Sequence, residues 1–268
     1  MGGTRRHAQG AGARGVWAAM VVVMAAPASA IQIETPRATV YVEDGALTEG
    51  EAARFSRLVD QGIADIESYL RPAAPAGLRR GRIVYRVLDR LPYSMTRGRT
   101  VSLTLDRVRS DSAPYLHETV HVLVPAPHRS LWLSEGFASF VESHVSETMG
   151  GYDSRVFSRT GNGGVDGEAA RWLSRDIGRA VLPYVGRSGE PPEMRWLRRR
   201  VAAPFYVMSQ SFTKFLVGRL GLERVLALVS SRDPEGELAL RSGRPVDAWK
   251  AEWLAAIGAA PGASAAGR

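Results

Sequence analysis

Residues 117–121 read His-Glu-Thr-Val-His and match the pattern H-E-x-x-H, and residues 132–138 follow with W-L-S-E-G-F-A. In a helix, positions i and i+4 lie on one face, so His117 and His121 can present two imidazoles to a single ion. Glu118 lies at the flank of that face and can reach a water on the ion without being a ligand itself. The spacing therefore predicts a helix that carries two metal ligands and a base.

A catalytic zinc ion takes three protein ligands and leaves one position open for water. Glu135 belongs to the second motif, with thirteen residues between it and His121, and is the natural third ligand. The chain has five histidines, and a chance H-E-x-x-H is expected on the order of once in a hundred such sequences or less. The two motifs together predict a Zn²⁺ site made of His117, His121 and Glu135. The alternative is a polar helix whose two histidines hydrogen-bond to their neighbours.

H-E-x-x-H followed by W-L-x-E-G-F-A resembles the gluzincin zinc metallopeptidases, and more narrowly the peptidase MA-like domains related to thermolysin and the M1 aminopeptidases. The resemblance covers roughly the middle and later thirds of the chain. It implies an α+β, zincin-like fold, with a small mixed sheet and its edge strand over the H-E-x-x-H helix and a mostly helical C-terminal part. It also implies peptide-bond hydrolysis with Glu118 as the general base.

The resemblance extends to a tyrosine on a later helix. The stretch 206–221 resembles the Y-x₅-F-x₂-F-L-x₄-G segment of MA-like peptidases. This implies that Tyr206 leans over the zinc and donates its hydroxyl to the oxyanion of the tetrahedral intermediate. The alternative for Tyr206 is core packing, and Tyr184 is the reserve candidate for the oxyanion role.

Two further features of the family match this chain. Glu142 shares a helix face with Glu135 at i+7 and resembles a later glutamate that orients a ligand histidine; the alternative is a surface glutamate. The strand at Arg99–Leu105 precedes the metal helix and is the candidate edge strand that pairs with an extended substrate; the alternative is an ordinary sheet strand. His128 follows the metal helix in a short loop, where exposure or a place in the pocket wall is expected rather than ligation.

The composition indicates one globular domain. The chain has 268 residues, of which 45% are hydrophobic and 23% charged, enough to bury a core. The net charge is +8, and nearly all of the basic charge is arginine, since Lys214 and Lys250 are the two lysines. No nucleic-acid-binding signature accompanies this charge, so we expect no nucleic-acid partner. The chain has no cysteine, so metal ligands must be histidines and carboxylates.

The two ends of the chain differ from the middle. Residues 1–30 combine a basic start, an apolar run and the small-x-small site Ala28-Ser29-Ala30, which is typical of a secretory signal peptide. We therefore expect an exported protein, periplasmic or extracellular, with a membrane contact if the segment stays uncleaved. Residues 31–257 form the expected peptidase domain, and the Ala, Gly and Pro-rich residues 258–268 a disordered tail.

Local patterns predict the remaining elements. Thr48 and Glu51 form a capping-box pattern that opens a helix to about Leu70. Asp111 or Ser112 is expected to cap the metal helix. The other expectations are strands at 31–44 and 83–88, helices at 131–148, 168–177, 204–220, 222–231 and 246–257, and loops at 150–167 and 186–192.

Three functions are compatible with these residues. The first is a zinc peptidase acting on a peptide or protein, with no support for aminopeptidase activity because no G-x-M-E-N segment occurs. The second is a zinc-binding envelope protein without proteolytic activity, and the third a hydrolase of a non-peptide amide. An open groove beside Thr100–Leu105 would favour a peptidase, and a filled one a scaffold.

Overall fold

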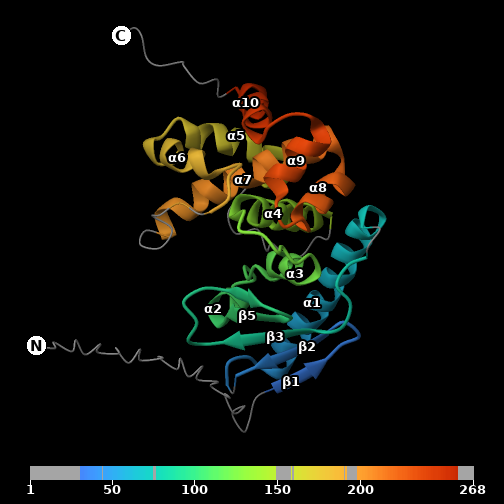
Figure 1. Cartoon of the computed structure of the whole chain (residues 1–268). Coiled ribbons are helices and arrows are strands. Elements are labelled where there is room, and N and C mark those ends of the chain that lie inside the picture. Colours follow the sequence, from blue (N-terminus) through green and yellow to red (C-terminus); the bar gives the residue numbers. More distant parts are fainter. Residues whose placement is uncertain are drawn as a thin grey trace, which may run out of the picture.

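The computed structural model describes residues 31–43, 45–74, 77–148, 158, 160–189, 191 and 198–258. The predicted signal segment and the tail from residue 259 lie outside these residues. Five strands form one mixed sheet in the order β1-β2-β3-β5-β4 (Figure 1). Strands β2, β3 and β5 run parallel, and β1 and β4 flank them antiparallel. The strands are β1 (Ile31–Glu34), β2 (Ala38–Val42), β3 (Ile83–Leu88), β4 (Met95–Arg97) and β5 (Thr100–Thr104).

Helices make up most of the remaining described chain, and the later ones gather on the side of α4 away from the sheet (Figure 1). This mixed α+β architecture, a five-stranded sheet with a mostly helical remainder, confirms the predicted fold class in outline. None of the described helices is long and apolar enough to cross a membrane. The helices are α1 (Glu49–Leu70), η1 (Arg71–Ala73), α2 (Leu105–Arg109), α3 (Tyr115–Leu123), α4 (Leu131–Thr148), α5 (Gly161–Leu173), α6 (Asp176–Val181), η2 (Leu182–Tyr184), α7 (Arg198–Leu220), α8 (Leu222–Val229), α9 (Pro234–Ser242) and α10 (Val246–Ala256).

Helix α1 starts at the predicted capping box. The Thr48 side chain accepts from the Glu51 amide, and the Glu51 carboxylate accepts from the Thr48 amide, so two otherwise unpaired donors of the first turn are satisfied. Farther along, Gly62 allows α1 to approach α3, because a Cβ there would lie 2.6 Å from a methyl carbon of Leu116. Helix α1 therefore supports the helix that carries the H-E-x-x-H sequence.

Helix α3 lies between the sheet and α4 (Figure 1). Its Thr119 hydroxyl donates to the Tyr115 carbonyl within the helix and lies 2.5 Å from the hydroxyl of Tyr85 on central strand β3. Tyr85 and Thr119 are fully buried, and burial raises the pKa of Tyr85 above its usual range. This hydrogen bond fixes the rotation of α3 relative to the sheet, and with it the direction of His117 and His121, each two residues from Thr119.

The structure contradicts the prediction that Arg99–Leu105 forms an edge strand. Strand β5 pairs with β3 on one side and with β4 on the other, so β4 is the edge. The three residues of β4 are too few to show an alternating pattern, so no local pattern predicts this strand. The ordinary-strand alternative is correct for Thr100–Thr104, whereas Leu105 begins helix α2.

Several predicted element boundaries are also wrong. Pro114 is the N-cap of α3 with no side-chain bond, and the expected cap Asp111 has a left-handed φ of 51° and pairs with Arg54 instead. Helix α5 begins at Gly161, inside the expected loop 150–167, whose first part lies outside the described residues. Helix α7 begins at Arg198, so that Pro204 lies inside it, and α9 was not predicted. In α5 and α7, tertiary packing outweighs the local glycine and proline signals.

Candidate metal centre

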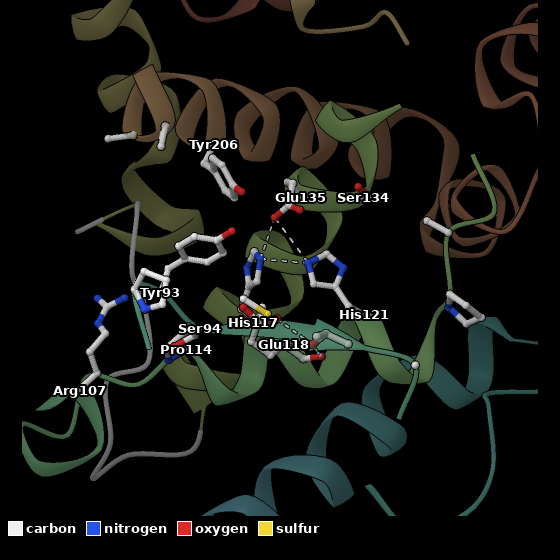
Figure 2. A pocket seen from close by; sticks show the side chains of 18 of the residues that line it. Tyr93, Ser94, Arg107, Pro114, His117, Glu118, His121, Ser134, Glu135 and Tyr206 are labelled. Carbon is white, nitrogen blue, oxygen red and sulfur yellow. Dashed lines mark hydrogen bonds and ion pairs between the residues drawn. The ribbon is translucent and has the colours of Figure 1, made fainter. Parts of the chain in front are cut away.

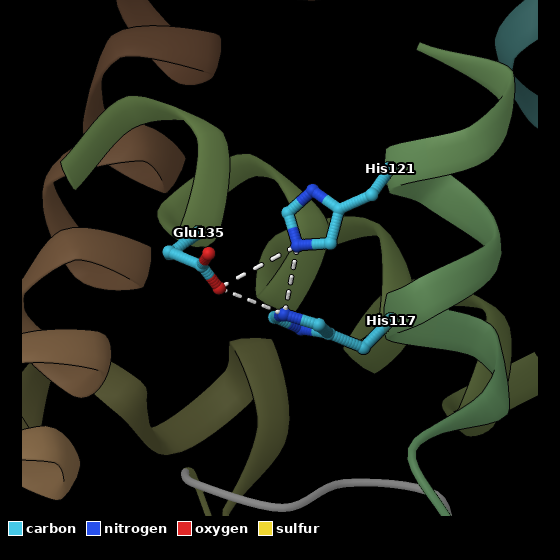
Figure 3. A group of neighbouring side chains, drawn as sticks. All are labelled: His117, His121 and Glu135. Atoms are coloured by element: carbon cyan, nitrogen blue, oxygen red, sulfur yellow. Dashed lines mark hydrogen bonds and ion pairs between the residues drawn. The ribbon is translucent and has the colours of Figure 1, made fainter. Parts of the chain in front are cut away.

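His117 and His121 of α3 and Glu135 of α4 converge on one point (Figure 3). The Nε2 atom of His117 is 3.0 Å from Oε2 of Glu135 and 3.2 Å from Nε2 of His121. These three atoms form a triangle, whose remaining side, from His121 Nε2 to Glu135 Oε2, is 3.5 Å. The structure thus brings together the three side chains that the sequence predicted as ligands.

The tautomer of His117 decides what this triangle can hold. Its other ring nitrogen, Nδ1, faces the Glu142 carboxylate at 3.7 Å and the Ser139 hydroxyl at 3.4 Å. A carboxylate there assigns the ring proton to Nδ1. The Nε2 lone pair of His117 then points at the lone pairs of Glu135 and His121. Lone pairs at these distances repel one another unless a proton or a metal cation lies between them.

The charges around these three side chains favour a cation at this site. Burial opposes protonation of His117, but its hydrogen bonds to Glu135 and Glu142 outweigh burial and raise its pKa well above 6.5. Burial also works against ionisation of Glu135, but His121 and His117 outweigh it and lower the pKa of Glu135. Without a metal, these contacts favour a proton on the His117 ring. Two imidazole nitrogens and one carboxylate oxygen are the donor set of catalytic zinc sites, so these residues fit Zn²⁺.

Glu118 is next to His117 on α3 but is not part of the triangle. Its side chain is 8% exposed and lines the same cleft as the histidines (Figure 2). The hydroxyl of Thr96, on β4, donates to its Oε2 at 2.7 Å. The sequence predicted Glu118 as a base but not its contact with Thr96, because the two residues are 22 positions apart and no local pattern links them.

A cleft of about 1010 Å³ opens over the triangle. One wall is α3, another is β4 with the segment before it, and a third is the start of α7. Ser94, Met95 and Thr96 contribute to the wall on the β4 side. The groove was expected beside Thr100–Leu105, but none of those residues lines this cleft, and the edge strand β4 lines it instead.

Two tyrosines enter the cleft from opposite walls. Tyr206 of α7 is 5% exposed, and Figure 2 shows its hydroxyl turned toward Glu135. Tyr93, in the segment before β4, is 43% exposed, and its hydroxyl is turned into the same space. Tyr184, the reserve candidate, lies on η2 and is not among the described residues that line the cleft. Tyr93 was not among the predicted site residues, since the segment around it has no periodic pattern.

Glu142 and the remaining histidines have distinct positions. Glu142 is 2% exposed, so the surface alternative does not hold. His128 accepts a hydrogen bond at Nδ1 from the Ser130 amide and lines the cleft, outside the triangle. His144 stacks on Tyr69 with ring centroids 3.9 Å apart. Of the described histidines, His117 and His121 alone belong to the candidate metal centre.

No protein-family model matches the chain, and no curated protein sequence matches it. Among solved structures, it is similar to a point mutant of the M1 zinc metallopeptidase from Deinococcus radiodurans, with 15% sequence identity and a TM-score of 0.45. The match covers 84% of this chain and 51% of that one, so the chain spans about half the length of that structure. At this level the likeness carries no argument about function.

Proposed function

We propose that this chain is a zinc-dependent peptidase of the gluzincin type. The observation that carries the proposal is the triangle of His117, His121 and Glu135, whose three donor atoms lie 3.0–3.5 Å apart and face one another. The cleft above the triangle supports a hydrolase over a scaffold, because a substrate can reach the site. Export, expected from residues 1–30, is part of the same proposal and rests on the sequence alone.

The residues around the triangle have separate roles in the proposed reaction. A zinc ion held by the triangle would lower the pKa of a water molecule and polarise the scissile carbonyl. Glu118 accepts the proton of the attacking water and returns it to the leaving amine. Glu142 keeps the His117 ring in the tautomer that leaves its Nε2 lone pair free for the ion. Tyr206 donates a hydrogen bond to the developing oxyanion.

The substrate is proposed to lie along β4 in extended form. An edge strand has backbone groups on its outer side that can pair with a peptide. Strand β4 is the sheet edge, and its residues Met95 and Thr96 line the cleft. A peptide added there would pass directly over α3, where Glu118 lies.

The test is the hydrolysis of a mixed peptide pool, followed by mass spectrometry. We expect wild-type protein with zinc to cleave peptides, and Glu118→Gln to bind zinc with a rate lowered at least about 100-fold, because general acid–base catalysis contributes about 10²–10⁴. Glu223→Gln, an exposed glutamate on α8, is the matched control and should act like wild type. Glu118→Gln turnover at the wild-type rate would show that Glu118 is not the base. Release of fragments from cell-wall material, with none from peptides, would support the non-peptide amide alternative.

A further inference from the structure

Thr96, on the edge strand β4, contacts the carboxylate of Glu118 on the neighbouring helix α3. Its Oγ1 is 2.7 Å from Oε2 of Glu118 and 3.1 Å from the backbone carbonyl oxygen of the same residue. A threonine hydroxyl has one proton to donate. The contact with the carboxylate is the shorter of the two and is charge-assisted, so it is the stronger hydrogen bond.

The pairing of Thr96 within the sheet holds its hydroxyl in place. Thr96 pairs with Val101 of β5, which is fully buried. A β-branched side chain has few χ1 positions in a strand. The location of Oγ1 is therefore set by the sheet and not by the cleft.

The carboxylate needs such an anchor. The Glu118 backbone is fixed in the first turn of α3, where its amide donates to the Pro114 carbonyl at 3.0 Å. Three side-chain torsions separate this backbone from the carboxylate, so a fixed helix alone does not fix the two oxygens. The bond to Oε2 selects one arrangement and leaves Oε1 as the oxygen without this bond.

The position of a base decides its rate of proton transfer. A misplacement of about 1 Å can cost about 100-fold. The strand that holds Glu118 also forms a cleft wall, through Met95 and Thr96. A peptide that pairs with β4 and the base that serves it would thus be fixed by the same strand.

We propose that Thr96 is a positioning residue, whose hydroxyl holds the Glu118 carboxylate at a fixed position beside the edge strand β4. This inference rests on the proposed function, in which Glu118 is the base. It assigns to β4 a second role besides lining the cleft.

Two substitutions at Thr96 separate the hydroxyl from the shape of the side chain. Thr96→Val removes the hydroxyl and keeps the branched shape that suits a strand. Thr96→Ser keeps the hydroxyl. Thr104→Val is the matched control, because Thr104 is on the adjacent strand β5 and its buried hydroxyl has no hydrogen-bond partner among the described residues. All three variants should fold and bind zinc as wild type does.

Steady-state kinetics on a peptide cleaved by the wild type give the first result. We expect kcat of Thr96→Val to fall about 10- to 100-fold with KM changed by less than about twofold, because the contact acts on the base and not on substrate binding. Thr96→Ser should recover most of kcat, and Thr104→Val should match wild type. An undiminished kcat in Thr96→Val, or an equal loss in Thr104→Val, would overturn the proposal.

Crystal structures of wild type, Thr96→Val and Thr96→Ser give a second result that needs no activity. We expect one Glu118 position in wild type and Thr96→Ser, and a displaced or divided carboxylate in Thr96→Val. An unchanged single position in Thr96→Val would refute the positioning role. If the wild type cleaves no peptide, the proposed function fails, and these structures still decide the role of Thr96.

Discussion

Gly136 follows the candidate ligand Glu135 at a close contact of α4 with α7. A Cβ at position 136 would lie 2.4 Å from the backbone oxygen of Ser209 and 2.5 Å from Oγ1 of Thr213. Ordinary contact begins at about 3.4 Å, so an alanine there forces the two helices apart by about 1 Å. The obstacle is backbone on a buried helix, which cannot move aside as the end of a flexible side chain can.

We expect Gly136→Ala to lower the free energy of unfolding by about 2 kcal/mol. Overpacking of a core costs about 1–3 kcal/mol, and a clash with backbone places this site at the upper end. The better helix propensity of alanine offsets about 0.5–1 kcal/mol, which leaves about 2 kcal/mol. For a chain of this size, about 2 kcal/mol corresponds to a fall in Tm of about 4–8 °C. Zinc affinity should fall with it, since the neighbouring Glu135 moves with α4.

Thermal unfolding followed by circular dichroism measures this effect. The matched control is Gly218→Ala, an exposed helical position on α7 with no atom within 4 Å of the added Cβ. It should gain about 0.5–1 kcal/mol from helix propensity alone. If Gly136→Ala unfolds at or above the wild-type temperature while Gly218→Ala behaves as stated, the close packing of α4 on α7 is refuted.

The other predictions concern the cleft and the pH dependence of zinc binding. Tyr206→Phe should lower kcat, measured at steady state, about 10²–10³-fold, as loss of an oxyanion donor does. Tyr184→Phe should leave kcat unchanged. A large loss in Tyr93→Phe instead would refute Tyr206 as the oxyanion donor. The raised pKa of His117 stabilises the metal-free fold fully below pH 6.5, and this stabilisation is lost as pH rises through the folded-state value. Zinc needs the neutral ring, so competition titrations should show its affinity falling as pH is lowered through that value. In Glu142→Gln the zinc affinity should begin to fall at a lower pH, because Glu142 helps to raise the pKa of His117. A zinc affinity that does not change with pH would contradict competition between the proton and zinc for His117.

The candidate ligands could be predicted from sequence because their geometry is local. His117 and His121 are one helical turn apart, and the helix that carries Glu135 was predicted at its observed bounds, residues 131–148. The capping box of Thr48 and Glu51 was likewise predicted correctly, since all of its hydrogen bonds lie within four residues.

The misses involve contacts between distant parts of the chain. Strand β4 exists because Met95–Arg97 pairs with β5 across a turn at Gly98, whose φ is +63°, and three residues show no periodicity of their own. Helix α5 begins with three glycines in its first four residues, against helix propensity. The side chain of its Asn162 donates to the Phe140 carbonyl of α4 and accepts from Gln210 of α7, and neither contact can be read from a local pattern.

The most direct test of the metal centre is zinc binding to purified protein, measured by titration and by X-ray absorption at the zinc edge. We expect one zinc per chain, held by two imidazole nitrogens and a carboxylate oxygen. Glu135→Ala should lose most of the affinity, and the exposed-site control Glu223→Ala should lose none. Wild-type protein that stays metal-free at saturating zinc, or Glu135→Ala that binds as tightly as wild type, would contradict it.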